Sequence, residues 1–352
     1  MSAAPPSLAA IGAQVELCLT ELLSAEEERW VRIEPELRAP LQSLAQLIQA
    51  GGKRLRPAFC YWGFIGAGGD PDDRGVVAAG AAFELLHGFA LFHDDVMDGS
   101  ATRRGARTAH LVYADRHRES GWLGEARRFG EGVAILVGDL AFVYADQLLA
   151  DAPAAAWRIW NELRIELNIG QYLDIVGTAA SERNRSGAER ISRYKSGKYT
   201  VERPLHLGAA LAAPERVEEL LPALSAYGLP LGDAFQLRDD MLGAFGKQEM
   251  TGKPVGDDLV EGKPTPLLAV ATERATLAQR RVLADVGRPG LGADDVAAIQ
   301  DVLMATGAFD ELNSVIAALV GEAVDSLEKA PIESSAQAAL TDLAYYVGSR
   351  ES

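Results

Sequence analysis

The sequence contains few cysteines and few long apolar runs, and each scarcity excludes a class of protein. Cys18 and Cys60 are the only cysteines in 352 residues, too few for a disulfide framework or a thiolate metal cage. The two most apolar stretches, 76–92 and 132–145, are interrupted by charged and polar residues, so neither predicts a membrane span. The N-terminal residues lack the basic region and apolar core of a signal peptide. We therefore expect a soluble, cytoplasmic protein.

Positive charge is also in the minority. The chain has 34 Lys and Arg against 50 Asp and Glu, a formal net charge of −16. Such a surface repels nucleic-acid phosphates and anionic lipid headgroups, so no nucleic-acid partner is expected. Any cluster of basic residues must then be local.

Strand-forming patterns are nearly absent, whereas helix formers with apolar residues at three- and four-residue spacing fill most of the chain. We predict an all-α fold in a single domain, 1–352, with residues 1–12 disordered. Segments rich in glycine and proline predict loops at 66–71, 99–108 and 243–266. The last is long enough to predict a functional loop. Several helices are apolar nearly all round, which is typical of a bundle centre or a subunit interface.

An acidic cluster ends the most apolar of these helices. Asp94 and Asp98 are four residues apart and share one helix face, with Asp95 between them. A solvated acidic surface is the alternative interpretation, but it fits poorly at the end of an apolar helix. Oxygen ligands at this spacing suit a hard cation such as Mg²⁺, so the pattern predicts a metal site.

A second acidic cluster has the same character. Gln236, Asp239 and Asp240 share a face after an apolar segment. Alone it could be a helix-end charge pair. Together the two clusters predict acidic helices that face each other across a metal site.

Basic residues gather near glycines in four segments. They are Lys53, Arg54 and Arg56; Arg103, Arg104 and Arg107; Lys195 and Lys198; and Lys253 and Lys263. Any one of them could be surface charge, but as a set they have the composition of an oxyanion site. Neither nucleotide-binding glycine motif is present, so the pattern favours diphosphates on an apolar carrier. His87 lies two turns before Asp94 on nearly the same face and is either part of this site or a core histidine.

In this order the motifs resemble those of the trans-isoprenyl diphosphate synthases, the polyprenyl synthetase family, and most of all its actinobacterial-type geranylgeranyl diphosphate synthases. The likeness is carried by 51–57, 93–98 with 103–105, 235–240 and 252–258. It implies a helical bundle of the isoprenoid synthase type around a central apolar cavity, and a homodimer. It also implies Mg²⁺, three ions per active site with Mn²⁺ able to substitute. The implied reaction condenses isopentenyl diphosphate with an allylic diphosphate by ionisation, condensation and elimination.

The resemblance assigns roles to single residues. The metal ligands are Asp94, Asp95, Asp98, Asp239 and Asp240. The groups that hold isopentenyl diphosphate are Lys53, Arg56, His87 and Arg104. The groups that hold the allylic diphosphate are Arg103, Lys195, Ser196, Gln236, Lys253 and Lys263. The catalytic residues are Asp94, Asp98, Asp239, Arg103 and Lys195. Two positions depart from the family pattern: Gly243 stands where a third aspartate is common, and Arg107 where a proline is common.

The residues upstream of the first cluster predict product length. Ala90 is small and lies one turn before Asp94, whereas Phe89 and Leu86 are bulky and lie at or below that level. A cavity closed by these two residues favours a C20 product, geranylgeranyl diphosphate, with C15 or a longer chain as alternatives. Alternatives of another class are a class I terpene cyclase and a non-catalytic partner subunit.

Overall fold

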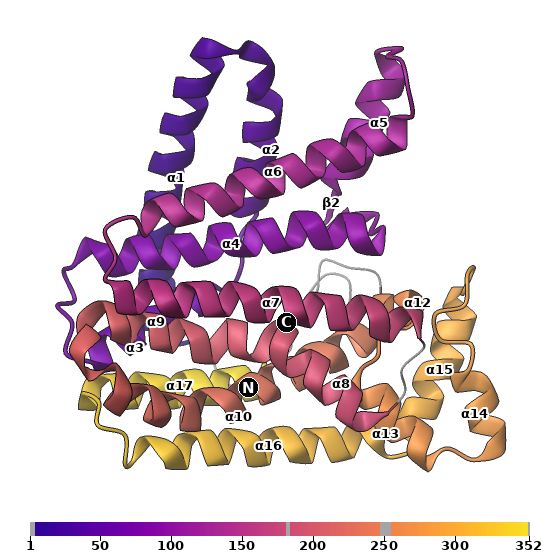
Figure 1. Ribbon diagram of the computed structural model, residues 1–352. Helices are drawn as coiled ribbons and strands as arrows, with labels where there is room; N and C mark the ends of the chain where they lie inside the picture. Colours follow the sequence, from indigo (N-terminus) through magenta and orange to yellow (C-terminus); the bar gives the residue numbers. More distant parts are fainter. Residues whose placement is uncertain (1–3, 181–183, 247–254, 351–352) are drawn as a thin grey trace. The chain divides into compact units, whose positions relative to one another are not determined.

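The structure is a computed structural model that describes residues 4–180, 184–246 and 255–350. Helices form nearly all of it (Figure 1), which confirms the predicted all-α class. Contacts divide the chain into two compact units. We call residues 6–61 and 70–152 the N-terminal unit, and 1–5, 62–69 and 153–352 the C-terminal unit. The single-domain assignment stays a prediction.

The N-terminal unit is built on two long apolar helices that pack together, α4 and α6. Its elements are α1 (Pro6–Ile33), η1 (Pro35–Leu37), α2 (Arg38–Gln49), most of α3 (Leu55–Gly66), α4 (Arg74–Asp98), β1 (Thr102–Arg103), β2 (Ala106–Arg107), α5 (Ala109–Glu119) and α6 (Ala126–Leu148). The carboxylate of Asp73 caps the start of α4 by accepting from Gly75 N at 2.6 Å. At its other end Gly99 adopts φ 66°, the left-handed conformation that ends helices. The acidic motif is thus fixed in the last turn of α4.

The C-terminal unit surrounds α10. Its elements are α7 (Ala154–Ala179), α8 (Arg185–Ser192), η2 (Arg193–Glu202), α9 (Arg203–Ala212), η3 (Pro214–Arg216), α10 (Val217–Phe245), α12 (Asp257–Glu261), α13 (Pro266–Arg274), α14 (Leu277–Leu283), α15 (Ala293–Ala305), α16 (Ala308–Leu327) and α17 (Ser334–Ser349). Figure 1 shows α16 and α17 running alongside α10. The core is aliphatic and aromatic: Trp160 and Tyr227 are fully buried, and the Tyr227 hydroxyl donates to Leu340 O at 2.7 Å.

One helix in this unit is wider than an α-helix. Residues Arg193–Glu202 form a π-helix, η2, in which Arg203 N donates to Lys198 O, five residues back. Pro204 follows directly, and its ring has no N–H and clashes with an α-helical carbonyl four residues earlier. The proline therefore explains why the chain leaves α geometry at this point.

Three local predictions differ from the structure. Residues 6–12 are helical, with Leu8 and Ile11 buried, rather than disordered, because their apolar side chains pack into the N-terminal unit. The predicted loop 99–108 contains the short hairpin β1–β2. The predicted loop 243–266 is interrupted, since α10 continues to Phe245 and α12 spans Asp257–Glu261.

Among the residues that the structure describes, two helices, α1 and α4, are long and apolar enough to cross a membrane by length and composition, and the bent pair α15–α16 makes a third if it is counted as one span. Within the most apolar 18-residue stretch of each helix, 61% of the residues are buried in α4 and 33% in α1. Since α4 also ends in three aspartates, these helices are not clear membrane spans.

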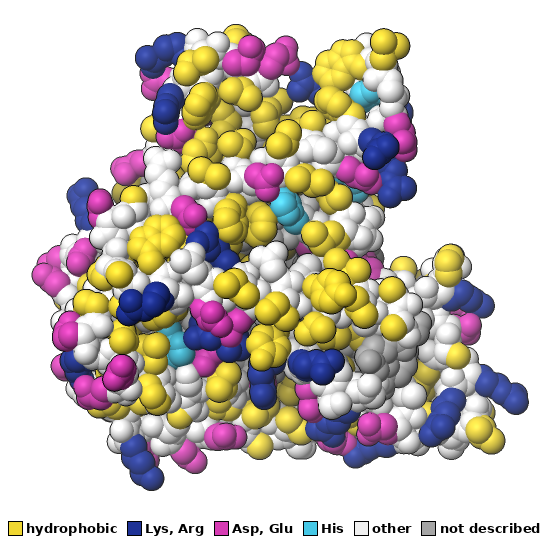
Figure 2. Space-filling model, viewed as in Figure 1, with side chains coloured by type: hydrophobic (Ala, Val, Ile, Leu, Met, Phe, Trp, Pro, Cys, Tyr) yellow, Lys and Arg dark blue, Asp and Glu magenta, His cyan; other side chains and the backbone are white. Residues whose placement is uncertain are grey.

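Several exposed apolar side chains lie on each of two helices, α6 and α7. They are Ile135, Leu136 and Val143 on α6, and Ile165, Ile169, Tyr172, Ile175 and Val176 on α7. Figure 2 shows hydrophobic side chains gathered where α2, α5 and α6 of the N-terminal unit meet. Exposed apolar area of this extent is typical of an interaction surface.

Candidate active site

The first acidic motif is held in place by an arginine from the β1–β2 hairpin. Asp95 is buried, and its Oδ1 accepts from Arg103 Nε at 2.8 Å and Nη2 at 2.5 Å. Asp94 is partly buried, with Oδ2 3.6 Å from the same Nη2. Asp98 follows one turn later and is also partly buried. Arg103 thus neutralises Asp95, and Asp94 and Asp98 share the face that the sequence predicted.

Behind this motif, arginines crowd around His87. The pKa of His87 is lowered well below 6.5, first by burial and then by the positive charges of Arg56, Arg104, Arg103 and Arg54. The pKa of Arg104 is lowered too, mainly by burial, while Glu84 opposes and the other arginines add to the shift. His87 is therefore neutral at pH 7. A cluster of like charges in a partly buried position favours a bound anion.

Two arginines of this cluster, Arg54 and Arg104, make contacts within the protein. Arg54 is buried and ion-paired with the buried Glu84, and its Nη2 donates to Ile48 O at 2.9 Å. It adopts φ 51°, as Arg104 adopts φ 52°, so both occupy backbone conformations that non-glycine residues seldom adopt. Arg104 Nη1 donates to Leu47 O at 2.8 Å. These contacts fix the segment 51–56, in which Lys53 and Arg56 are only partly buried.

The residues proposed to set the length of the product chain lie on α4. Leu86 is fully buried in the N-terminal unit, and Ala90 is partly buried. Phe89 packs against Phe142 of α6 with ring centroids 4.8 Å apart, and against His93 at 4.5 Å. Their role in product length stays a prediction.

The second acidic motif lies on α10. Asp240 is buried, and its Oδ1 accepts from Gln236 Nε2 at 2.7 Å. Its pKa is raised well above 3.8 by burial, then by the negative charges of Asp258 and Asp239. Asp239 is more exposed and pairs at 2.5 Å with Nη2 of Arg350, whose guanidinium lies 3.9 Å over the Phe235 ring.

Asp258 is a site residue that sequence reasoning missed. A Cβ atom at Gly243 would overlap the Asp258 carboxylate, so this carboxylate occupies the space that a side chain at 243 would need. Lys263 Nζ lies 3.4 Å from Asp258 Oδ1 and 2.7 Å from Glu261 Oε2. The signal was present, since Asp258 ends the segment 252–258 that carried the family resemblance. Asp258 therefore brings a third carboxylate to the second motif.

The remaining predicted residues of this unit lie on η2. Lys195 Nζ pairs with Asp174 Oδ2 of α7 at 2.5 Å, and Ser196 follows it. Neither Asp174 nor Arg350 had a spacing signal in the sequence. Lys253 lies outside the described residues.

Each unit thus brings part of the predicted site together. The N-terminal unit groups Arg56, His87, Asp94, Asp95, Asp98, Arg103 and Arg104. The C-terminal unit groups Gln236, Asp239, Asp240 and Lys263 with Asp258. That the two acidic helices face each other stays a prediction. Within 4–180, 184–246 and 255–350, no three His, Cys, Asp or Glu side chains are already arranged as a metal site.

The donors fit a hard divalent cation all the same. Asp240, Asp239 and Asp258 are close enough for the charges of the last two to raise the pKa of the first. Carboxylates held together against their repulsion, with oxygen as the only donor atom, suit Mg²⁺.

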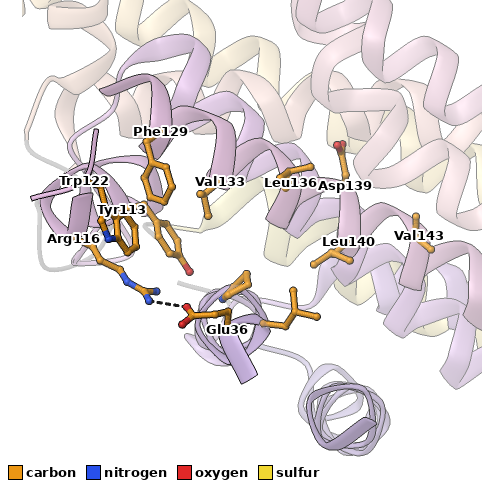
Figure 3. Close-up of a pocket in the computed structure, with 12 residues that line it drawn as sticks. Glu36, Tyr113, Arg116, Trp122, Phe129, Val133, Leu136, Asp139, Leu140 and Val143 are labelled. Atoms are coloured by element: carbon orange, nitrogen blue, oxygen red, sulfur yellow. Dashed lines mark hydrogen bonds and ion pairs between the residues drawn. The ribbon is translucent and has the colours of Figure 1, made fainter. Parts of the chain in front are cut away.

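A separate apolar groove of about 460 Å³ lies in the N-terminal unit (Figure 3). Its floor is α6, with Val133, Leu136 and Val143, and η1 and α5 form its sides. Glu36 and Arg116 form an ion pair across it at 3.3 Å. None of the predicted site residues lines this groove.

Comparison with known proteins now identifies the class of the chain. The family model described as Polyprenyl synthetase matches residues 37–303. The chain belongs to this family. The predicted family, all-α fold and prenyltransferase class are thereby confirmed.

Individual relatives cover most of the chain. The structure of geranylgeranyl pyrophosphate synthase from Corynebacterium glutamicum, complexed with isoprenyl diphosphate and magnesium, is 35% identical and superposes with a TM-score of 0.91 over 97% of this chain and 99% of that chain. Geranylfarnesyl diphosphate synthase of Aeropyrum pernix is 32% identical over 81% of this chain and 86% of that protein. (2E,6E)-Farnesyl diphosphate synthase of Mycobacterium tuberculosis is 32% identical over 85% of this chain and 80% of that protein. Their products differ in length.

The crowding around Asp240 predicts a gain in stability when its charge is removed. Without metal, Asp240→Asn should raise the free energy of unfolding at pH 7, because the raised pKa means that the ionised, buried carboxylate costs the folded state stability. The raised pKa means that the cost exists above pH 3.8 and shrinks as the pH falls. The variant and the wild type should therefore converge near pH 4. Urea unfolding in EDTA measures this, with the exposed Asp301→Asn of α15 as the control. A lower stability of Asp240→Asn at pH 7 would contradict the assignment.

Proposed function

We propose that the protein is a Mg²⁺-dependent trans-prenyl diphosphate synthase that condenses isopentenyl diphosphate with dimethylallyl, geranyl or farnesyl diphosphate to give geranylgeranyl diphosphate. The observation that carries the proposal is the cluster of arginines around His87, beside the acidic motif of α4, in a chain with a net charge of −16. A site with cations for one diphosphate and carboxylates for metal-bound diphosphate matches a reaction between two diphosphates.

The side chains of the N-terminal unit suit the binding of isopentenyl diphosphate. Lys53, Arg56 and Arg104 supply charged donors for its oxygens. Neutral His87 supplies a hydrogen-bond donor without a competing titration near pH 7. These side chains need no metal to bind isopentenyl diphosphate.

The allylic diphosphate is the substrate whose carbon–oxygen bond breaks. Its diphosphate leaves with the bonding electron pair and gains charge as the bond lengthens, so Arg103, Lys195 and Lys263 stabilise the transition state more than the ground state. The double bond of isopentenyl diphosphate attacks the allylic carbocation and forms the new carbon–carbon bond. A proton then leaves the product for the departing diphosphate, so no dedicated protein base is required.

The carboxylates would hold the metal. Asp94, Asp95 and Asp98 in one unit and Asp239 and Asp240 in the other are the proposed ligands, three Mg²⁺ ions per active site is the proposed number, and Mn²⁺ is the proposed substitute. When bound, the ions would neutralise diphosphate charge and act as Lewis acids. Because Arg103 neutralises Asp95, we propose that Asp94 and Asp98 are the principal ligands of the first motif.

Two readings of another class fit less well. A class I terpene cyclase has no need of a second diphosphate site, so the cluster around His87 would be without a ligand. A non-catalytic partner subunit would have lost motif carboxylates. Here Asp258 occupies the place left by Gly243, so the second motif keeps three carboxylates. Farnesyl diphosphate or a longer chain remains the alternative product.

The protein is further proposed to act in the cytoplasm as a homodimer. The exposed apolar residues of α6 and α7 support this assembly. Leu136 and Val143 of α6 also line the groove in Figure 3, so a second copy that covers the apolar face of α6 would cover the groove as well.

The first test is activity. With Mg²⁺, labelled isopentenyl diphosphate and an allylic primer, the wild type should form labelled prenyl diphosphates. Asp94→Asn should reduce turnover by about 10²-fold or more, as removal of a preorganised charge stabiliser does. Asp151→Asn, an exposed residue of the same unit, should leave turnover unchanged. Cyclic hydrocarbons formed from the primer while the labelled isopentenyl diphosphate stays unreacted would favour the terpene cyclase. No turnover without an added second subunit would favour the non-catalytic partner.

Product length tests the residues upstream of the first motif. Phe89→Ala should shift products beyond C20 by lowering the cavity floor, and Ala90→Phe should shorten them. Leu86→Ala, combined with Phe89→Ala, should lengthen the products further. It should also destabilise the fold by about 2–5 kcal/mol, because Leu86 is fully buried. Met97→Ala, at an exposed position of α4, is the control. Chromatographic sizing of dephosphorylated products gives the answer. A wild type that stops at C15, or variants that leave the distribution unchanged, would show that these residues are not the floor.

Sedimentation equilibrium tests the assembly. The wild type should have twice the mass of one chain, and a charge placed on the apolar face of α6, Leu136→Glu, should shift it toward the mass of one. Leu277→Glu changes an exposed leucine of α14, which is not part of that face, and should leave the dimer intact. A single-chain mass for the wild type at micromolar concentration would refute the dimer.

A further inference from the structure

A stripe of three residues on α7 faces the wide helix η2. Glu166, Gly170 and Asp174 follow one another at four-residue spacing, so they share one face of α7. Each contacts η2 or the residue after it. Glu166 pairs with Lys198 and Arg203. A Cβ at Gly170 would overlap the backbone of Lys195. Asp174 pairs with Lys195 itself.

Glu166 pairs with both Lys198 and Arg203, and this double pairing depends on the width of η2. Arg203 donates from Nε to Oε2 at 2.7 Å and from Nη2 to Oε1 at 2.6 Å, and Lys198 Nζ donates to the same Oε1. Lys198 and Arg203 are five residues apart. In an α-helix such residues point about 140° apart, because each residue turns the chain by about 100°. Hydrogen bonding from residue i to i+5 brings them to the same side.

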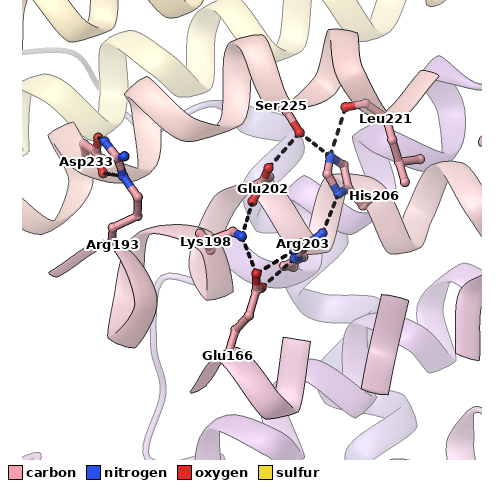
Figure 4. A network of polar contacts seen from close by, with 9 residues as sticks. All are labelled: Glu166, Arg193, Lys198, Glu202, Arg203, His206, Leu221, Ser225 and Asp233. Carbon is pink, nitrogen blue, oxygen red and sulfur yellow. Dashed lines mark hydrogen bonds and ion pairs between the residues drawn. The ribbon is translucent and has the colours of Figure 1, made fainter. Parts of the chain in front are cut away.

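The rest of the network anchors the same segment to α9 and α10 (Figure 4). Lys198 lies 3.7 Å from Glu202 Oε2, and Ser225 of α10 donates to Glu202 Oε1 at 2.7 Å. Ser225 also lies 3.0 Å from His206 Nε2. Two carboxylates and two cations thus balance in this buried network, which sets the turn that follows Lys195.

We propose that Glu166 is a positioning residue for Lys195: by holding Lys198 and Arg203 together it fixes the wide register of η2, and with it the direction in which Lys195 presents its ammonium group to the allylic diphosphate. The inference rests on the proposed function for the role of Lys195. Glu166 itself touches no reacting atom. Its effect reaches the substrate through the rotation of η2.

The hydrogen-bond register of η2 can be measured without an activity assay. Hydrogen–deuterium exchange should show that Glu166→Gln loses protection in 193–203 while the core of α10 stays protected. Glu166→Gln/Lys198→Met removes the carboxylate together with one of its cations. It should therefore fold without a surplus buried charge and show the same local loss. Glu219→Gln, which removes an exposed ion pair with Arg216, should change nothing. Full protection of 193–203 in both Glu166 variants would overturn the proposal.

The kinetic test separates positioning from general stability. Glu166→Gln should lower kcat/KM for the allylic diphosphate by about tenfold or more, since a small misplacement of a charged group is costly. The KM for isopentenyl diphosphate should stay within about twofold. In a Lys195→Ala background the same substitution should have little further effect. Equal losses for both substrates, or losses that add fully to that of Lys195→Ala, would overturn the proposal. A wild type without prenyl transfer would instead overturn the proposed function, and the exchange experiment would still decide the register.

Discussion

Compensation of partly buried charge is the constraint on which the functional parts of this protein depend. Where the charges balance, they hold structure: Glu84 offsets Arg54, and Glu166 offsets Lys198 and Arg203. Where one sign gathers, the surplus marks a site. Arginines gather around His87 in one unit, and carboxylates gather around Asp240 in the other. A positive surplus favours phosphate oxygens and a negative surplus favours a divalent cation, and the proposed function assigns a diphosphate to the first cluster and Mg²⁺ to the second.

Charge also explains how the chain departs from its family's second motif without losing its chemistry. Gly243 removes a carboxylate from α10, and the space is taken by Asp258 from the start of α12. Two cations pair with this group: Arg350 with Asp239, and Lys263 with Asp258. The motif is thus assembled from several segments, and its carboxylates need not come from one helix.

The sequence predicted the helical class and located both acidic clusters and the arginine-rich segments, because these depend on local spacing and on residue chemistry. It could not show that Arg54 pairs with Glu84, because this buried carboxylate is 30 residues away in the sequence. Asp174 and Arg350 join the predicted residues only through tertiary packing. Asp258 belongs to the motif segment 252–258, but only the structure shows its carboxylate beside Gly243. The π-helix was equally hidden, because Pro204 alone predicts a break and the Glu166 clamp that selects the wide turn comes from another helix.

In the proposed function, arginines bind one diphosphate and carboxylates bind the other through metal. Calorimetric titration in EDTA, and then in excess Mg²⁺, tests this directly, with isopentenyl diphosphate and a non-ionising allylic thiodiphosphate as ligands. Isopentenyl diphosphate should bind with similar affinity in both conditions, whereas the allylic analogue should bind only with Mg²⁺. Loss of isopentenyl diphosphate binding in EDTA, or full binding of the allylic analogue without metal, would contradict the account.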